Sequence, residues 1–572
     1  MNLSADIKKL PRKFLPESFV VTDWESMESY FKELLDRPIN SKTELEKWLK
    51  DSSELEAVLS EDACWRQIRM TCDTENKSLE EAFVYFVTQI QPKIQPYADK
   101  LNRKLIDSPF TKELDQEQYF TYLRNVKKSI DLFREENIPL LSELSVLAQQ
   151  FGVINGKMTV EVGGKEYTLQ RAAKFLENHD RNLREEVYRK ISERRSQDKE
   201  TLNTLYSQLV QKRQQVAKNA GFENYRDYKF KELGRFDYAK EDCYQFHEAV
   251  KQHILPLVEQ IYEKKKKKLG LDKLRPWDLE AEPEGINPLR PFTTGQELLD
   301  KSISVFQQIR PFFADCLRKM NSMNRFDLES RKGKAPGGYN CPLAETGAPF
   351  IFMNAAGQMH DVTTMVHEGG HAVHSFVTHP LELSSFKEYP MEIAEVASMA
   401  MELFSMDYWD VFFQEKEELA RAKEHQLERV ITIFPWIATI DKFQHWVYEN
   451  PNHTVEQRGE KWLQILNEFS SVNIDFQGLE QYRTYSWQRQ LHLFEVPFYY
   501  IEYGIAQLGA IGLWHQFRIN KDAALDNYIR SLSLGGTRTL PELYKAAGLE
   551  FNFSPAYIKK LMDFVKDEMA KA

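Results

Sequence analysis

Two histidines spaced one helical turn apart place the strongest constraint on how this 572-residue chain can fold. They are His367 and His371, in a run that reads MVHEGGHAVH from Met365 to His374. In a helix, both imidazoles lie on one face and can reach the same small cation, with Glu368 beside them. The pair needs a third ligand, so another segment of the chain has to pack against this helix.

The spacing matches the HExxH motif of metallopeptidases, in which two histidines hold a metal ion. Glu368 is then placed to take a proton from a water molecule without being a ligand itself. The variant with a third histidine requires one six residues after His371, and that position is Val377. A carboxylate from a following helix remains as the third ligand of a zinc site.

The segment from Met391 to Met406, MEIAEVASMAMELFSM, predicts such a helix. It carries Glu392, Glu395 and Glu402. We favour Glu395 as the ligand, with Glu392 as the alternative, and expect Glu402 to hydrogen-bond a ligand imidazole and fix its tautomer. The flanking apolar residues predict a buried helix, where an unpaired acid is costly, so a merely solvated acidic face is disfavoured.

Composition excludes several other classes of protein. Few Gly and Pro residues and long runs of helix-forming residues predict a mostly helical chain. A formal net charge of -10 gives no support to nucleic-acid binding, and the basic run from Lys264 to Lys268 reads as a solvated helix end. The five cysteines are scattered and odd in number, which favours a reducing compartment. Residues 1–19 lack an apolar core and no stretch is apolar enough to span a membrane, so we expect a cytoplasmic protein.

The order of segments along the sequence predicts an N-terminal region followed by a catalytic region. Amphipathic helices are predicted from Trp24 to about Gln149, and Gly163-Gly164 predicts a hairpin between Met158 and Leu169. Although length alone suggests roughly three or four domains, we place one boundary near residue 185. Residues 1–185 form an N-terminal helical region with a short hairpin, and residues 186–572 form the catalytic region.

Short strands are predicted directly before the histidine helix, at Tyr339–Cys341 and Pro349–Met353. An exposed edge strand there can pair with an extended peptide. The alternative is a sheet that only packs beneath the helix. Asp361 is the expected N-cap of that helix. His360 and His374 lie seven residues to either side of His367 and could line the site, although we favour a supporting or structural role for both.

These residues resemble the thimet oligopeptidase and oligoendopeptidase F family of zinc metallopeptidases, and most closely its bacterial oligoendopeptidase F and Pz-peptidase branch. The resemblance covers roughly Gln170 onward. It rests on HEGGHAVH, AEVASMAMELF, GGYN, PFIFMN, HLFEVPFYYIEYGIAQLG and SLGGTRTLPELYKAAGL. The family implies a large, mainly helical, clam-like fold, with one zinc ion deep in a channel that admits short unstructured peptides.

The resemblance also implies roles for individual residues. The metal ligands become His367, His371 and Glu395, and the general base becomes Glu368. His492, Tyr500 and Tyr503 match the residues that steady the reaction intermediate. Without the resemblance, Tyr499, Tyr500 and Tyr503 read more readily as core aromatics.

The expected function is therefore zinc-dependent endopeptidase activity on short peptides. Three alternatives stay open: a non-catalytic peptide-binding protein on the same fold, a helical scaffold in which the motif is accidental, and a zinc carboxypeptidase or aminopeptidase. The sequence does not settle the oligomeric state.

Overall fold

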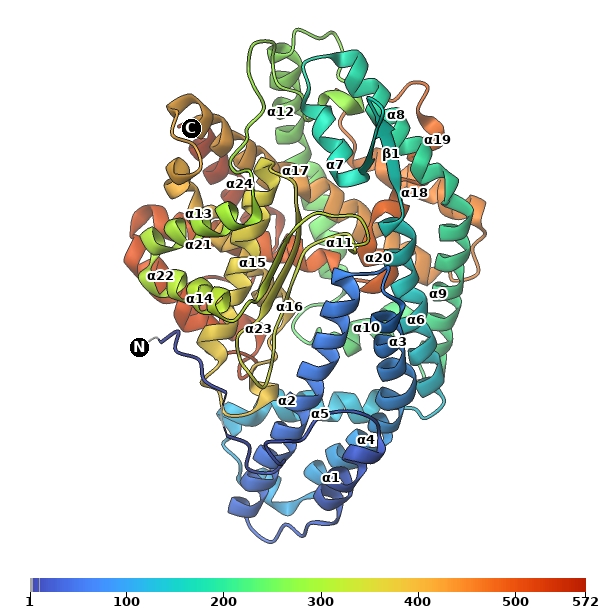
Figure 1. Ribbon diagram of the computed structural model, residues 1–572, viewed down its shortest axis with the longest axis vertical. Helices are drawn as coiled ribbons and strands as arrows, with labels where there is room; N and C mark the ends of the chain where they lie inside the picture. The colour runs from blue at the N-terminus through green and yellow to red at the C-terminus, as the bar shows by residue number, and fades with distance from the viewer. Residues whose placement is uncertain (1–3, 10, 572) are drawn as a thin grey trace.

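A computed structural model of the chain describes residues 4–9 and 11–571. Helices dominate, and two small sheets accompany them (Figure 1). The larger sheet lies beside the helix that carries the HExxH motif. The sequence prediction of a mainly helical fold with a small sheet next to this helix is confirmed.

Of the six N-terminal helices, α1, α4 and α5 lie at the lower end of the elongated molecule in Figure 1, and α2, α3 and α6 extend toward its middle. Their bounds are α1 Glu25–Asp36, α2 Lys42–Cys72, α3 Lys77–Tyr85, α4 Gln91–Asp107, α5 Gln116–Leu132 and α6 Asn137–Gly156. Trp24 and buried residues of α1, α2, α4 and α5, including Trp48, form a separate hydrophobic cluster. Leu383 and Phe386, from the segment before α16, join this cluster and connect the N-terminal helices to the region of the motif helix.

The predicted hairpin is present, with β1 Thr159–Val162 antiparallel to β2 Lys165–Thr168. Gly163 and Gly164 both have positive φ, which a two-residue hairpin turn of this kind requires. The next helices are α7 Leu169–Ala173, α8 Arg181–Gln197, α9 Lys199–Asn219, α10 Tyr225–Glu232, α11 Lys240–Ala249 and α12 Leu255–Lys268. The basic run occupies the last turn of α12, as predicted.

After α13 Gly295–Ile309 and α14 Pro311–Ser322, the chain forms a three-stranded sheet. Its strands are β3 Phe326–Glu329, β4 Tyr339–Cys341 and β5 Phe350–Ala355, in the order β3-β5-β4. The central strand β5 is parallel to β3 and antiparallel to β4. β4 is therefore an edge strand, in the position that the sequence predicted for a peptide-binding edge.

The motif helix α15 spans Met359–Thr378 and begins earlier than expected. Asp361 is not its N-cap, which is Gln358. Asp361 lies inside the first turn, where its Oδ2 accepts hydrogen bonds from the backbone N–H groups of Ala356, Gly357 and Gln358. A carboxylate that reaches back in this way satisfies backbone donors at and before the N-cap, upstream of the first turn.

The remaining helices complete the main core. They are α16 Met391–Ser405, α17 Lys416–Glu449, α18 Val455–Phe469, α19 Glu480–Arg483, α20 Leu491–Glu495, α21 Tyr500–Ile519, α22 Lys521–Leu532, α23 Leu540–Ala546 and α24 Pro555–Met569. Every residue of α16 after Met391 is buried, and the helix packs against α15 and α21. The main hydrophobic cluster contains residues from both sides of residue 185, and the boundary there remains a prediction.

Within the described ranges, none of the helices combines the length and the apolar character needed to cross a membrane.

Candidate active site

Helices α15 and α16 approach each other closely because a glycine lies between the two histidines of the motif. A Cβ on Gly370 would lie 2.6 Å from both the backbone oxygen of Ala397 and the Cα of Ser398. This contact leaves no space for a side chain. It brings Glu395, two residues before Ala397 on α16, up to the face of α15 that carries His367 and His371.

The side chains of His367, His371 and Glu395 lie close together. One ligand atom from each of His367, His371 and Glu395 lies within 4.8 Å of the other two. Glu395 Oε2 is 3.2 Å from Nε2 of His367 and 3.7 Å from Nε2 of His371. Two imidazoles and one carboxylate are a standard ligand set for a catalytic zinc ion.

The charges in this group are strongly coupled. Burial opposes the charged form of Glu395, but His371 and His367 together lower the pKa of its carboxyl to about 2. Burial also opposes the charged form of His367, yet Glu395 and Glu402 raise the pKa of that imidazole well above its usual value. For His371, burial is the main cause, and it lowers the imidazole pKa to about 4. The carboxylates thus create a site where a positive charge is favoured.

Glu402 supports His367 from the side away from Glu395, as the sequence predicted. Nδ1 of His367 lies 2.7 Å from Glu402 Oε1, and Gln426 donates to Glu402 Oε2 at 2.8 Å. These contacts fix the ring so that Nε2 points at the cluster. Gln426 lies on α17, and no pattern in the surrounding sequence predicts this role.

Glu392 does not join the group of potential ligands. Its Oε1 accepts a hydrogen bond of 2.6 Å from the hydroxyl of Tyr238. Ser398 instead donates to Glu395 Oε2 at 3.1 Å, and the hydroxyl of Tyr499 donates to Glu395 Oε1. The geometry therefore favours Glu395 over Glu392 as the third ligand.

Glu368 lies beside the cluster and is almost completely buried. Its Oε2 has no hydrogen-bond partner among residues 4–9 and 11–571. Burial raises the pKa of this carboxyl to about 7. A carboxyl with a free oxygen and a pKa near neutrality is suited to accepting and returning a proton.

The C-terminal residues predicted for the site come from α20 and the start of α21. Nε2 of His492 lies 3.2 Å from the hydroxyl oxygen of Tyr503, and Gln490 contacts the other ring nitrogen of His492 at 2.7 Å. Burial lowers the pKa of His492 to about 4, so this imidazole is neutral at physiological pH. Burial likewise raises the pKa of Tyr500 to about 12, which keeps its hydroxyl protonated as a hydrogen-bond donor.

Two cavities meet at the cluster. One has a volume of about 500 Å³ and is lined by His367, Glu368, His371, Glu395, Tyr499 and Tyr503, together with Gly338, Tyr339 and Asn340 at strand β4. The other has a volume of about 300 Å³ and is lined by His492 and Tyr500. His367, Glu368 and Tyr503 line both cavities. The edge strand thus opens onto the same space as the cluster, whereas a continuous channel remains a prediction.

His360 and His374 lie outside the ligand group. His374 is fully buried, and its ring stacks on Tyr389 with centroids 3.5 Å apart. His360 contacts the guanidinium of Arg429. His374 is thus a structural residue, whereas His360 lines the smaller of the two cavities.

A helical fold with a His, His and Glu cluster that lines two cavities is typical of a metallopeptidase. Comparisons with known proteins support this class. The sequence pattern described as Peptidase family M3 matches residues 174–563, and that of the Peptidase M3 N-terminal domain matches residues 14–133. Since the first match alone covers more than half of the chain, the protein belongs to peptidase family M3.

Individual relatives agree with this assignment. The oligoendopeptidase F homolog of Borreliella burgdorferi is 23% identical over 87% of this chain and 85% of its own length. Oligopeptidase PepF of Bacillus subtilis is 25% identical over 71% of this chain and 60% of its own length. A solved structure of Pz peptidase A with an inhibitor is 25% identical, covers 98% of this chain and 99% of its own, and superposes with a TM-score of 0.92. The resemblance inferred from the sequence is confirmed.

Proposed function

We propose that this protein is a zinc endopeptidase that cleaves internal bonds of short, unstructured peptides. The observation that carries the proposal is the free oxygen of Glu368 beside the His367, His371 and Glu395 cluster, at a cavity wide enough for an extended chain. The donor set fits zinc, because it offers two imidazoles and one carboxylate and leaves a side open toward the cavity. When bound there, zinc would polarise the scissile carbonyl and make water more acidic.

Glu368 acts as the general base in this proposal. Its free Oε2 takes a proton from the attacking water and later delivers it to the departing amine. Negative charge develops on the carbonyl oxygen as the water adds to the carbonyl carbon, and the hydroxyl of Tyr503 would donate a hydrogen bond to it. His492 holds that hydroxyl at 3.2 Å, and Tyr500 lines the smaller cavity. Tyr499 is assigned to holding Glu395.

Substrate binding is assigned in part to strand β4. Its free edge can add a strand through backbone hydrogen bonds, which read an extended chain without selecting its side chains. Asn340 of β4 donates to the backbone oxygen of Glu368 at 3.2 Å and so ties the edge strand to the motif helix. This arrangement suits broad selectivity among unstructured peptides and excludes folded proteins.

Substitution of the base tests the catalytic assignment. Glu368→Gln is expected to keep the metal and to reduce kcat by roughly 10²- to 10⁴-fold, since it removes the proton acceptor but little volume. Glu495→Gln is the matched control, because burial also raises the pKa of Glu495 to about 7, yet it lines neither cavity. Wild-type activity in Glu368→Gln would show that another group is the base.

Metal content tests the third ligand. Glu395→Ala is expected to lower zinc by one equivalent per chain in elemental analysis. Undiminished zinc would point to Glu392 instead.

Peptides blocked at both ends separate an endopeptidase from a carboxypeptidase or aminopeptidase. An internally quenched peptide with an acetylated amino end and an amidated carboxyl end should be cleaved as fast as its unblocked form. Cleavage of the unblocked peptide alone would favour an exopeptidase, and absence of cleavage with full metal content would favour a peptide-binding protein.

A further inference from the structure

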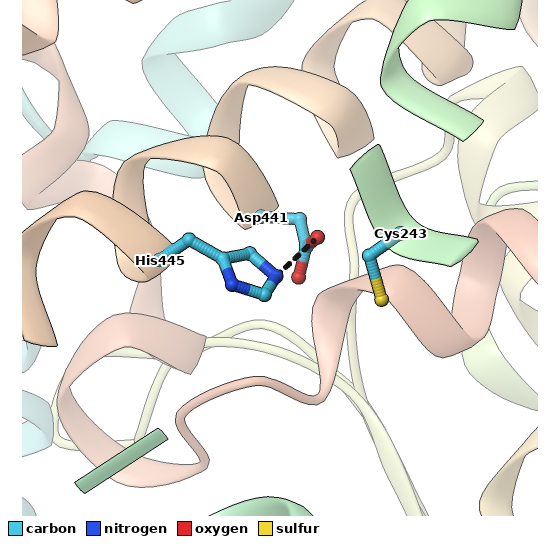
Figure 2. A group of neighbouring side chains, drawn as sticks. All are labelled: Cys243, Asp441 and His445. Atoms are coloured by element: carbon cyan, nitrogen blue, oxygen red, sulfur yellow. Dashed lines mark ion pairs between the residues drawn. The ribbon is translucent and has the colours of Figure 1, made fainter. Parts of the chain in front are cut away.

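A second cluster of metal-ligating side chains lies between α11 and α17, formed by residues that the catalytic proposal does not use. Cys243 and His247 are one turn apart on α11, and Asp441 and His445 are one turn apart on α17. Residues at this spacing share a helix face. The two faces meet, and Figure 2 shows Cys243 reaching from its helix toward Asp441 and His445 on the other.

The geometry of this cluster matches that of the catalytic group. One ligand atom from each of Cys243, Asp441 and His445 lies within 4.8 Å of the other two, as also found for His367, His371 and Glu395. Asp441 Oδ2 lies 2.8 Å from Nε2 of His247 and 3.3 Å from Nε2 of His445. All four side chains are almost completely excluded from solvent.

Several polar atoms of the cluster are unsatisfied. Asp441 Oδ1 and Nδ1 of His445 are buried and have no hydrogen-bond partner within the part of the chain that the structure describes, and Nε2 of His445 has only its 3.3 Å contact with Asp441 Oδ2. Burial of a polar atom without a partner costs roughly 1–3 kcal/mol, and more for a charged group. A cation beside Asp441 Oδ1 and one ring nitrogen of His445 would satisfy both, so these atoms point to a missing ligand.

We propose that Cys243, Asp441 and His445 bind a divalent cation of the zinc class, with His247, whose Nε2 lies 2.8 Å from Asp441 Oδ2, as the candidate for the fourth ligand. Thiolate, imidazole and carboxylate are all zinc ligands, and a closed set of four is typical of a structural site. Binding replaces the thiol proton of Cys243, which passes to solvent. The thiolate and the Asp441 carboxylate then balance the two charges of the cation, so the buried site is neutral overall.

The surroundings favour a structural role over a catalytic one. The ring of His445 is packed edge-on against Phe230, Tyr244 and Phe498, with centroids between 5.0 and 5.8 Å. Neither of the two cavities at the active site includes a ligand of this cluster. A cation here would have no open position for a substrate.

The cluster would stabilise a segment that leads into the active site. Gln444, between two of the proposed ligands on α17, accepts a hydrogen bond of 2.6 Å from the backbone N–H of Phe498. Phe498 has a φ of 66°, a conformation that is unfavourable for a bulky residue and needs support from its neighbours. Tyr499 and Tyr500 follow directly. Fixing α17 at Asp441 and His445 therefore also fixes the start of α21.

Cobalt substitution tests this proposal, because a thiolate ligand gives Co²⁺ a near-ultraviolet charge-transfer band that a site without sulfur lacks. The full-length protein is produced in medium with cobalt as the only added divalent transition metal, and its spectrum and metal content are measured. We expect two cobalt ions per chain and a thiolate band in the wild-type protein. Cys243→Ser should abolish the band and remove one cobalt ion.

Matched variants decide which thiol is responsible. Cys316→Ser removes another fully buried thiol, on α14, and should leave the band and both ions in place. Cys64→Ser should also leave the band, although Cys64 lies against Cys341. The proposal is overturned if the wild-type protein shows no thiolate band, or if the band disappears with Cys64 or Cys316 and not with Cys243. The wild-type spectrum is decisive even if Cys243→Ser does not fold.

Discussion

The two ligand clusters of this protein use similar side chains in opposite surroundings. Each takes a pair of residues one turn apart from one helix and at least one carboxylate from the other. In the catalytic cluster, the side chains of His367 and His371 are 16% and 15% exposed, and they face a cavity of about 500 Å³. In the α11 and α17 cluster, Cys243 and His445 are 1% and 2% exposed and aromatic rings surround them.

This difference shows that ligand type alone does not determine the role of such a cluster. An open position next to a free carboxylate permits chemistry on a substrate, whereas a closed and dry site can only contribute to stability. Glu368 is the residue that distinguishes the two, because the closed cluster has no corresponding proton acceptor facing a cavity. The helix packing differs as well. Gly370 allows backbone contact between α15 and α16, while α11 and α17 contain no glycine.

The largest expected effect comes from a chelator. Dialysis of the folded protein against a strong chelator should abolish peptide hydrolysis and remove the metal of the open cluster, because water and chelator reach it through the cavity. The closed cluster should keep its metal until the protein unfolds. Metal content and activity measured on the same samples test this, and added zinc should restore activity. Loss of both metals at the same rate under native conditions would erase the distinction between the clusters.

The hydroxyl of Tyr503 tests the chemistry that we propose for the open cluster alone. Tyr503→Phe should lower kcat by about 10²- to 10³-fold, the usual effect of losing one donor to a developing oxyanion. KM should change little, and metal content should not change. Tyr544→Phe is the control, since this buried hydroxyl packs against α21 and donates to the backbone oxygen of Ile505 at 3.3 Å, away from the cavities. Equal losses in both variants would indicate a general packing effect.

Glu402 tests how far support from outside the ligand set matters. Glu402→Ala removes the carboxylate that contacts Nδ1 of His367 at 2.7 Å and should weaken metal binding or activity by roughly 10- to 100-fold. Competition with a metal indicator measures the affinity. The metal of the closed cluster should be unaffected. In the variant, the affinity should therefore fall for one metal ion per chain and stay at the wild-type value for the other. An unchanged affinity would mean that Glu395 and His371 hold the site without this support.

Much of the catalytic cluster could be predicted from sequence because its geometry is local. The spacing of His367 and His371 fixes a shared helix face, and the apolar context of α16 predicts its burial. The residues that support these ligands could not be predicted from the sequence. Gln426 comes from a helix that touches the site only through the tertiary fold, and Tyr499 differs from its neighbouring tyrosines only in where the start of α21 directs it.

The closed cluster was missed for the same physical reason. The pairs Cys243 with His247 and Asp441 with His445 are each visible at a spacing of four residues, but either pair alone is common in helices. Only the packing of α11 on α17 brings them together, across nearly two hundred residues of sequence. The start of α15 was misjudged because Asp361 reaches back over its own first turn, which the pattern of residues does not distinguish from an N-cap.

The smallest expected effect concerns the contact between α15 and α16 that sets the open cluster apart. Gly370→Ala places a Cβ 2.6 Å from backbone atoms of Ala397 and Ser398, so the helices must separate. We expect a loss of about 1–3 kcal/mol in the free energy of unfolding, as is typical of overpacking, together with weaker metal binding at the open cluster. Denaturant titration measures the first and competition with a metal indicator the second.

The control for this variant is Gly152→Ala in α6, where an added Cβ meets no described atom within 4 Å. A helical glycine without steric constraint should gain about 0.4–1 kcal/mol on becoming alanine, because the unfolded chain loses freedom. Opposite signs for the two variants would locate the effect in the α15 and α16 contact. If Gly370→Ala is as stable as the wild type and binds metal equally well, backbone contact is not what brings Glu395 to the histidines, and the packing difference between the two clusters has no bearing on their function.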